Sequence, residues 1–263
     1  MKYFYDCEFL EGTQTKRFLG IPYAKTKPTI DLISIGVVAE DGRELYLISK
    51  EFNLREAWDR YDLKKEYPDD TEEGAVSRKV YWIRENVLKP IFEELCKQDR
   101  TYDDGFFVLK VIDNFTYKNL KYLINKYGYT NAEIAEKVKE FVYNQTNEDK
   151  YYNELSSKPE LYGYYSAYDH VVLCWLFGKM IDLPKGFPMY TIDVKQMLDE
   201  KIKFLQLFYI GGMISAEKDR LCSFEEKLDK VKALPNYPKQ TNKHNSLSDA
   251  RWNKELYNFI KSL

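Results

Sequence analysis

The alternation of apolar and polar residues predicts three strands within the first fifty residues. Residues 29–40 alternate between two sets of side chains, Ile33, Ile35, Val37 and Leu32, Ser34, Gly36. Asp41-Gly42 is a two-residue hairpin signal, so residues 43–49 are expected to return antiparallel. Residues 3–9 are rich in aromatic side chains, contain no Gly or Pro, and predict an earlier strand.

Helical periodicity dominates the later part of the chain. Residues 10–28 are expected to form a polar loop and residues 54–79 a charged surface insertion. A helix is expected from about Ser77, with a kink or restart at Pro90, and Asn131 is a good N-cap for a helix over residues 132–143. The remaining predicted elements are helices at 115–127, 167–180, 195–202 and from 247 onward, and strands at 160–165 and 189–194.

This order indicates an α/β fold. Three antiparallel strands are followed by helix, strand, helix, strand and helix, which predicts one domain with a mixed sheet flanked by helices.

Composition narrows the class of protein. The net charge is −2, from 40 basic and 42 acidic residues, which argues against a protein that wraps long DNA but not against an enzyme that grips a few nucleotides. The four cysteines are widely spaced with no CxxC pair, so a zinc cluster is not expected and a reduced, cytoplasmic compartment fits best. No signal peptide and no apolar run of about 20 residues is seen, so no membrane span is expected.

Two acids lie in the middle of the first strand. Asp6 and Glu8 are two residues apart, so they point to the same side, with Cys7 on the other. Paired carboxylates in an apolar strand are unfavourable unless a positive charge lies between them. A divalent cation would supply that charge.

Two Ser-x-x-Asp segments begin predicted helices, at Ser166–Asp169 and Ser246–Asp249. One interpretation is a capping box that serves only the helix N-terminus. The other is that Asp169 and Asp249 project from the edge of the sheet toward the acids of the first strand, because a helix N-terminus favours an ionised carboxylate.

His244 is one of two histidines in the chain and precedes Asp249 by five residues, which places it on a loop. It is either a surface residue or, beside the acids, a neutral imidazole that takes a proton from a metal-bound water.

The ordered set Asp6, Glu8, Asp169, His244 and Asp249 resembles the DEDD 3′-5′ exonucleases of the ribonuclease H-like fold, histidine subgroup. Four segments resemble the polyadenylate-specific 3′-exoribonuclease AS family, relatives of RNase T, more closely: residues 4–9, 32–44, 167–174 and 249–251. Relative to that family, residues 54–79, 99–129 and 203–232 look like insertions.

The resemblance implies a five-stranded mixed sheet and a homodimer. It further implies that Asp6, Glu8, Asp169 and Asp249 hold two Mg²⁺ or Mn²⁺ ions and that His244 is the general base. The expected reaction is release of nucleoside 5′-monophosphates from the 3′ end of single-stranded, adenylate-rich RNA.

Substrate contacts are expected from the Cys7 to Phe9 backbone, from Phe9 and from Tyr168, although Phe9 could equally be core and Tyr168 packing. Five lysines before the last predicted helix could contact RNA phosphates or form a solvated face: Lys227, Lys230, Lys232, Lys239 and Lys243. Two other functions stay open: a broad or DNA-directed exonuclease, and a catalytically silent nucleic-acid-binding module.

Overall fold

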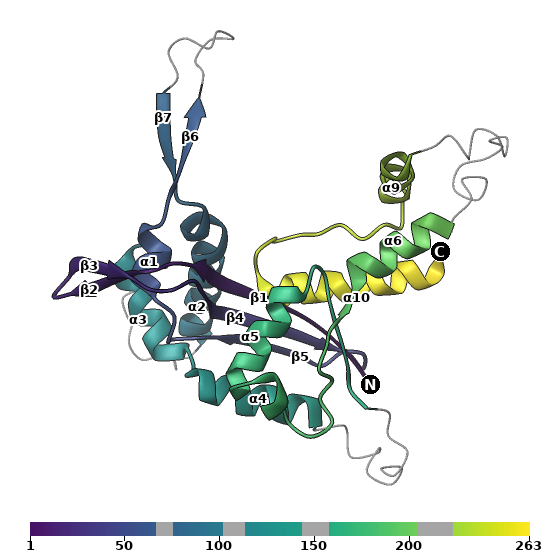
Figure 1. Ribbon diagram of the computed structural model, residues 1–263, viewed down its shortest axis with the longest axis horizontal. Coiled ribbons are helices and arrows are strands. Elements are labelled where there is room, and N and C mark those ends of the chain that lie inside the picture. Colours follow the sequence, from purple (N-terminus) through teal and green to yellow (C-terminus); the bar gives the residue numbers. More distant parts are fainter. Residues whose placement is uncertain (67–75, 102–113, 144–157, 205–222) are drawn as a thin grey trace.

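A computed structural model describes residues 1–66, 76–101, 114–143, 158–204 and 223–263 (Figure 1). Its centre is a five-stranded sheet with the strand order β5-β4-β1-β8-β9. The strands of this sheet are β1 Lys2–Gly12, β4 Thr29–Ala39, β5 Glu44–Ile48, β8 Glu160–Gly163 and β9 Ile192–Asp193. β4 is antiparallel to β1 and β5, while β8 is parallel to β1 and β9. The predicted mixed sheet, of the ribonuclease H-like kind, is therefore confirmed.

Helices cover both faces of the sheet. α4 (Asn131–Tyr143) and α5 (Ala167–Phe177) pack on the face that carries Tyr3, Tyr5 and Cys7. On the opposite face, α10 (Ser246–Ser262) packs over Phe4 together with α6 (Val194–Phe204) and α9 (Phe224–Lys232). Amphipathic helices bury their apolar stripes against a sheet in this way because neither element can hide its apolar side chains alone.

A second group of helices packs beside α10 on that same face. It consists of α1 (Leu54–Asp59), a π-helix (Arg84–Leu88), α2 (Lys89–Thr101) and α3 (Tyr117–Tyr127), which enclose Leu10, Ile33 and Ile48. A short 3₁₀ turn, Met180–Asp182, follows α5. Among the described residues, no helix has the length and apolar character needed to cross a membrane.

A β-bulge in β4 changes one predicted face. Glu8 pairs with Ser34 but Phe9 pairs with Leu32, so Ile33 is the extra residue. The prediction that Ile33 shares a face with Ile35 is wrong, because a bulge reverses the alternation of side chains beyond it.

The predicted loop at residues 10–28 is also wrong. β1 continues to Gly12, and β2 (Thr15–Phe18) pairs antiparallel with β3 (Ile21–Lys25) in a separate hairpin. A second hairpin, β6 (Asp62–Glu66) with β7 (Val76–Val80), lies within the expected insertion. Both hairpins project away from the central sheet (Figure 1).

Other boundaries differ by smaller amounts. The helix expected from Ser77 begins only after β7, and Pro90 is the second residue of α2. α4 is capped by Thr130 rather than Asn131, because Thr130 exchanges hydrogen bonds with Glu133 in a capping box. Residues 205–222 and 102–113, within two of the expected insertions, lie outside the described residues.

Candidate active site

Strand β1 supplies the first two acids. Cys7 is buried with Tyr3 and Tyr5, so Asp6 and Glu8 point to the opposite face, as a period of two predicts. β8 pairs with β1 only as far as Phe4. The edge of β1 beyond Phe4 is therefore open to side chains from elsewhere.

Helix α5 brings Asp169 to that open edge. The Asp169 Oδ1 atom accepts a hydrogen bond of 2.8 Å from the backbone N–H of Cys7, and Asp169 is buried. Ser166 makes no side-chain capping bond in α5. The Asp169 carboxylate therefore accepts a hydrogen bond from the β1 backbone between Asp6 and Glu8. The interpretation in which Asp169 serves only the start of its own helix does not account for this bond.

Helix α10 approaches the sheet very closely at Gly36, the residue of β4 that pairs with Asp6. A Cβ atom on Gly36 would lie 2.3 Å from the backbone nitrogen of Leu247, so only glycine allows this contact. The hydroxyl groups of Ser34 and Ser246 share a 3.0 Å hydrogen bond at the same place. The first turn of α10 is thus held against the strand pair that carries Asp6 and Glu8.

Asp249 and His244 lie in this first turn and the loop before it. Asn245, not Ser246, is the N-cap of α10. Asp249 accepts hydrogen bonds through both carboxylate oxygens, from the Gln240 side chain at 2.6 Å and from the His244 backbone N–H at 2.8 Å. His244 has a positive φ of 64°, which turns the loop back toward the helix.

Three of these residues form a tight group. A potential ligand atom of Glu8, one of His244 and one of Asp249 all lie within 4.8 Å of one another. Asp6 and Asp169 are not part of that group, but they are near enough for their charges to act on each other and on it.

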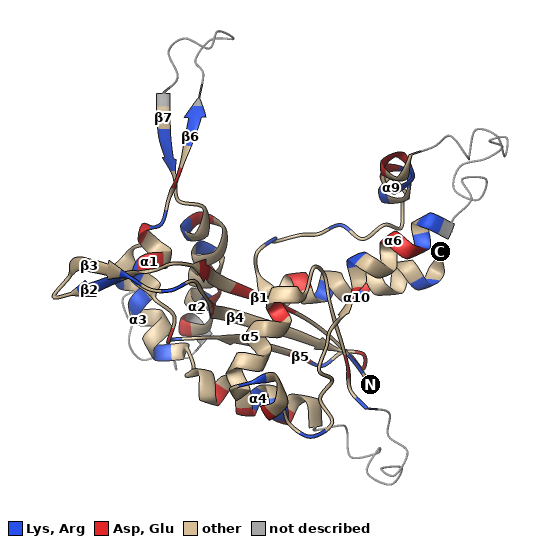
Figure 2. Cartoon of the chain, viewed as in Figure 1, with Lys and Arg blue, Asp and Glu red and all other residues tan. Residues whose placement is uncertain are grey.

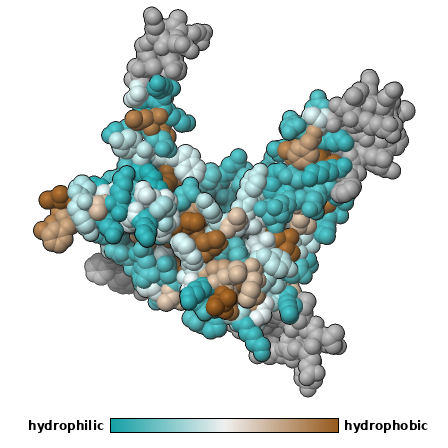
Figure 3. Space-filling model, viewed as in Figure 1, coloured by the Kyte–Doolittle hydropathy of each residue, from teal (hydrophilic) through white to brown (hydrophobic). Residues whose placement is uncertain are grey.

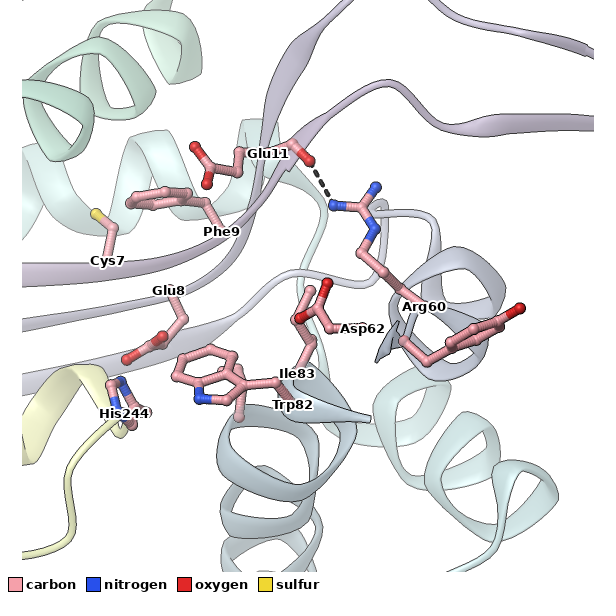
Figure 4. A pocket seen from close by; sticks show the side chains of 11 residues that line it. Cys7, Glu8, Phe9, Glu11, Arg60, Asp62, Trp82, Ile83 and His244 are labelled. Atoms are coloured by element: carbon pink, nitrogen blue, oxygen red, sulfur yellow. Dashed lines mark hydrogen bonds between the residues drawn. The ribbon is translucent and has the colours of Figure 1, made fainter. Parts of the chain in front are cut away.

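A cavity of about 500 Å³ adjoins the group (Figure 4). Its wall includes Glu8 and Phe9 from β1, His244 from the loop, and Trp82 from the start of the π-helix region. Trp82 and His244 meet edge to face, with ring centroids 4.7 Å apart. The imidazole is therefore held between an aromatic wall and the acids.

Burial raises the pKa of every one of the four acids, because a charge there is poorly solvated. The pKa of Glu8 rises to about 8 and that of Asp169 to about 7. For Asp6, burial and then the charges of Asp169, Glu8 and Asp249 raise the pKa well above its usual range. Without a cation, the folded site would therefore retain protons at neutral pH.

The donor set suits a hard divalent cation. Carboxylate oxygens are the ligands that Mg²⁺ and Mn²⁺ prefer. The charges that raise the pKa of Asp6 and of Glu8 are those of other acids, so these two carboxylates lie in a negative environment that a cation would neutralise. Asp6, Glu8, Asp169 and Asp249 are the residues that could hold such an ion.

The expected substrate contacts have mixed surroundings. Cys7 lines the cavity, but its backbone N–H is already donated to Asp169, which removes that group from ribose recognition. Phe9 also lines the cavity and packs edge to face on Tyr168, with ring centroids 5.8 Å apart. Tyr168 is about half exposed, so the pair offers an aromatic edge beside the acids.

Trp82 and Gln240 belong to the site but were not among the residues expected from the sequence. Trp82 lies in a segment whose helical periodicity masks its place on the cavity wall, and Gln240 lies in a loop without regular pattern. No local signal marks either residue, because each is defined by a contact with the loop and helix around His244 and Asp249.

No protein-family model matches the chain. Two curated proteins from Mycobacterium tuberculosis are similar to it: "3′-5′ exoribonuclease Rv2179c" of strain H37Rv and "3′-5′ exoribonuclease MT2234.1" of strain CDC 1551. Each is 26% identical over 203 residues, which cover 76% of this chain and 76% of the relative. This distant similarity supports the prediction of a nuclease enzyme of the 3′-5′ exonuclease kind.

Proposed function

We propose that the protein is a metal-dependent 3′-5′ exoribonuclease that releases nucleoside 5′-monophosphates from single-stranded RNA. The observation that carries the proposal is the convergence of four carboxylates, two of them buried, and one histidine beside one cavity, drawn from β1, α5, α10 and the loop before α10. The names of the two similar proteins support RNA as the substrate.

In this proposal Asp6, Glu8, Asp169 and Asp249 hold two Mg²⁺ or Mn²⁺ ions. When bound, such ions stabilise charge on the attacking and leaving oxygens of a phosphodiester. The protein's own contribution is to bring the four carboxylates together and to fix their orientation. Gln240 and the His244 backbone orient Asp249, and the Cys7 N–H orients Asp169.

His244 is proposed as the general base. Its ring lies within 4.8 Å of Glu8 and Asp249, close enough to reach a water molecule that the carboxylates also contact. Trp82 limits the movement of the ring. The proton of the attacking water would pass to the imidazole, and the 3′ oxygen of the preceding nucleotide would leave.

Phe9 and Tyr168 are proposed to contact the terminal bases, and a preference for adenylate-rich RNA is proposed on the family resemblance. Base stacking on an aromatic side chain contributes about 1–3 kcal/mol. Phe9 is placed for such a contact because it lines the cavity next to Glu8.

One assay tests the proposal. Labelled oligo(A), oligo(U) and single-stranded DNA are incubated with wild type and with Asp6→Asn, in Mg²⁺ or in chelator. The expected result is release of nucleoside 5′-monophosphate from RNA that needs both metal and Asp6, with AMP released from oligo(A) faster than UMP from oligo(U). Asp31→Asn is a control, since that carboxylate contacts Gln14 and Thr29 rather than the site.

The other outcomes separate the rival functions. Equal cleavage of DNA would indicate a broad exonuclease. RNA binding with no release in any metal would indicate a silent binding module, and would overturn the proposal. A homodimer is also proposed by resemblance, and light scattering at micromolar concentration that gives the monomer mass would contradict it.

A further inference from the structure

The β2–β3 hairpin exposes apolar side chains to an unusual degree. We refer to residues 15–28 as the arm. Phe18, Leu19, Ile21 and Tyr23 at its tip are between 67% and 86% exposed, and all residues of β3 are exposed. Figure 3 shows this tip as an isolated hydrophobic patch at the end of the projection. A lone hairpin with an apolar end is marginal by itself, which indicates that it contacts something.

The charge of the arm indicates a polyanion. Residues 15–28 contain four cations, Lys16, Arg17, Lys25 and Lys27, and no acid, in a chain whose net charge is −2. Lys16, Lys25 and Lys27 make no ion pair or side-chain hydrogen bond with any described residue. Exposed aromatic rings between unpaired cations are the combination that binds single-stranded nucleic acid without sequence preference.

The arm is rooted at the wall of the cavity. Arg60 and Glu11 both line the cavity, and Arg60 donates hydrogen bonds to the backbone oxygens of Glu11 and Thr13 (Figure 4). The Thr15 N–H is bonded to Glu56 of α1. Thr15 follows Glu8 by seven residues, at most about 25 Å of chain. The arm therefore begins within reach of a strand whose 3′ end lies at Glu8.

The second hairpin is a weaker candidate. β6 and β7 carry Lys64, Lys65, Arg78 and Lys79, but Asp62 lies beside them, and the Lys79 ammonium group lies over the Tyr61 ring, 4.1 Å from its centroid. Figure 2 shows acidic and basic residues together at the base of this hairpin, whereas residues 15–28 contain no acid. Among the described residues of the two hairpins, those of the arm carry the more exposed aromatic rings, Phe18 and Tyr23, and include no acid.

We propose that the arm is a second RNA-binding site, which holds the single strand upstream of the nucleotides in the catalytic cavity. Phe18 and Tyr23 stack on bases, and Lys16, Lys25 and Lys27 contact phosphates. This inference rests on the proposed exoribonuclease function and adds to it a preference for long substrates. A stacked trinucleotide spans only about 10 Å, so the proposal predicts that it gains little from the arm.

The first test is RNA binding in the Asp6→Asn background, so that the strand is not degraded. Lys16→Ala/Lys25→Ala should lower the slope of log affinity against log salt by about 1.4, because each phosphate contact on a single strand contributes about 0.7. Phe18→Ala/Tyr23→Ala should weaken binding of a 20-nucleotide oligo(A) about 10-fold or more. Lys118→Ala/Lys121→Ala on α3 removes the same charge from another exposed element and should leave the slope unchanged.

The second test is length dependence in the active enzyme. The ratio of kcat/KM for the 20-nucleotide substrate to that for a trinucleotide should fall about 10-fold in the Phe18→Ala/Tyr23→Ala variant. Light scattering on the same variant checks whether the tip instead joins two copies of the chain. A loss of mass with RNA binding retained would overturn the proposal in favour of a protein interface.

The outcomes distinguish the two proposals. If wild type degrades RNA but the arm variants match the α3 control in the salt slope and wild type in the length dependence, the arm inference is wrong and the enzyme assignment survives. If wild type releases no nucleotide yet the arm variants weaken binding with the expected salt slope, the enzyme assignment is wrong and the arm site stands. Unchanged thermal unfolding of the arm variants is expected, because their side chains are exposed.

Discussion

The starts of helices α5 and α10 share the same order of features. A residue with positive φ, Tyr165 at 53° or His244 at 64°, is followed by a cap residue and then by an acid in the first turn. The cap of α10 is Asn245, one residue earlier relative to the acid than Ser166 in α5. One helical residue is about 100° of rotation, so the two acids leave their helices in different directions.

That difference gives the acids different partners. Asp169 reaches outward to the backbone of β1, through one oxygen. Asp249 turns back to Gln240 and to the His244 backbone, through both oxygens. Identical Ser-x-x-Asp patterns thus place one carboxylate on the strand and the other on the loop that carries the proposed base.

The largest expected effect is on turnover. Asp169→Asn and Asp249→Asn should each lower kcat about 10³- to 10⁴-fold, because each removes a charge proposed to hold a metal worth several kcal/mol to the transition state. Initial rates of AMP release in saturating Mg²⁺ measure this. Near-normal turnover in either variant would remove that residue from the proposed site.

The same two variants should also differ in thermal stability. In Asp169→Asn, the carbonyl oxygen of the new amide can still accept from the Cys7 N–H, and repulsion with Asp6 is relieved. In Asp249→Asn, repulsion with Glu8 and Asp6 is relieved as well, but the new amide has a single acceptor oxygen for two donors, which costs about 1 kcal/mol of hydrogen bonding. In chelator, the thermal midpoint should stay level or rise for Asp169→Asn and should be lower for Asp249→Asn than for Asp169→Asn.

The two residues with positive φ, His244 and Tyr165, should differ in their effect on turnover. His244→Ala should lower kcat about 10²-fold or more while RNA affinity changes little, because a general base acts on the transition state. Tyr165 precedes the cap of α5 as His244 precedes the cap of α10. Its side chain is largely exposed, so Tyr165→Ala should leave kcat within about twofold. Equal losses in both variants would mean that the loop conformation, not the imidazole, matters.

Each helix start also rests on a glycine. A Cβ on Gly36 would meet the α10 backbone at 2.3 Å, whereas a Cβ on Gly163 would meet the Ser166 side chain at 2.7 Å. The Ser166 atom is its Cβ, so in both cases the helix backbone must move, but the contact at Gly36 is closer and involves three backbone atoms at 2.3–2.4 Å. Gly36→Ala should therefore destabilise more, by about 1–3 kcal/mol. Chemical denaturation compares the two, and Gly36→Ala should also reduce turnover because it displaces Asp249 and His244.

The smallest expected effect is the dependence of stability on pH. The folded pKa values of Glu8 and Asp169, about 8 and about 7, lie above those of an unfolded chain. The folded state therefore binds more protons between about pH 4 and 8, and stability of the metal-free protein falls as pH rises through that range.

Calorimetry in chelator at about pH 5, 6.5 and 8 measures the fall. Mg²⁺ should restore stability mainly at the highest of these pH values, and Glu8→Gln should flatten the profile. A midpoint that rises across the series in chelator would contradict the assignment of raised pKa values.

The sheet and the convergent acids could be predicted from the sequence, but their surroundings could not. That Asp6 and Glu8 point to the same face of β1 follows from the side-chain period of a strand alone. The order of strands and helices predicted the mixed sheet. The arm was taken for a polar loop because Gly20 and Pro22 interrupt its alternation. The bulge at Ile33 leaves no mark in the pattern, because it depends on how β4 meets β1.

By itself, the sequence determined the local elements and the two faces of β1, because side-chain period and chain direction are properties of neighbouring residues. Only the tertiary structure decided that Asp169 bonds to Cys7, that α10 rests on Gly36, and that Trp82 confines His244. These contacts join residues far apart along the chain. They arise when helices bury their apolar faces against the sheet, which no local pattern encodes.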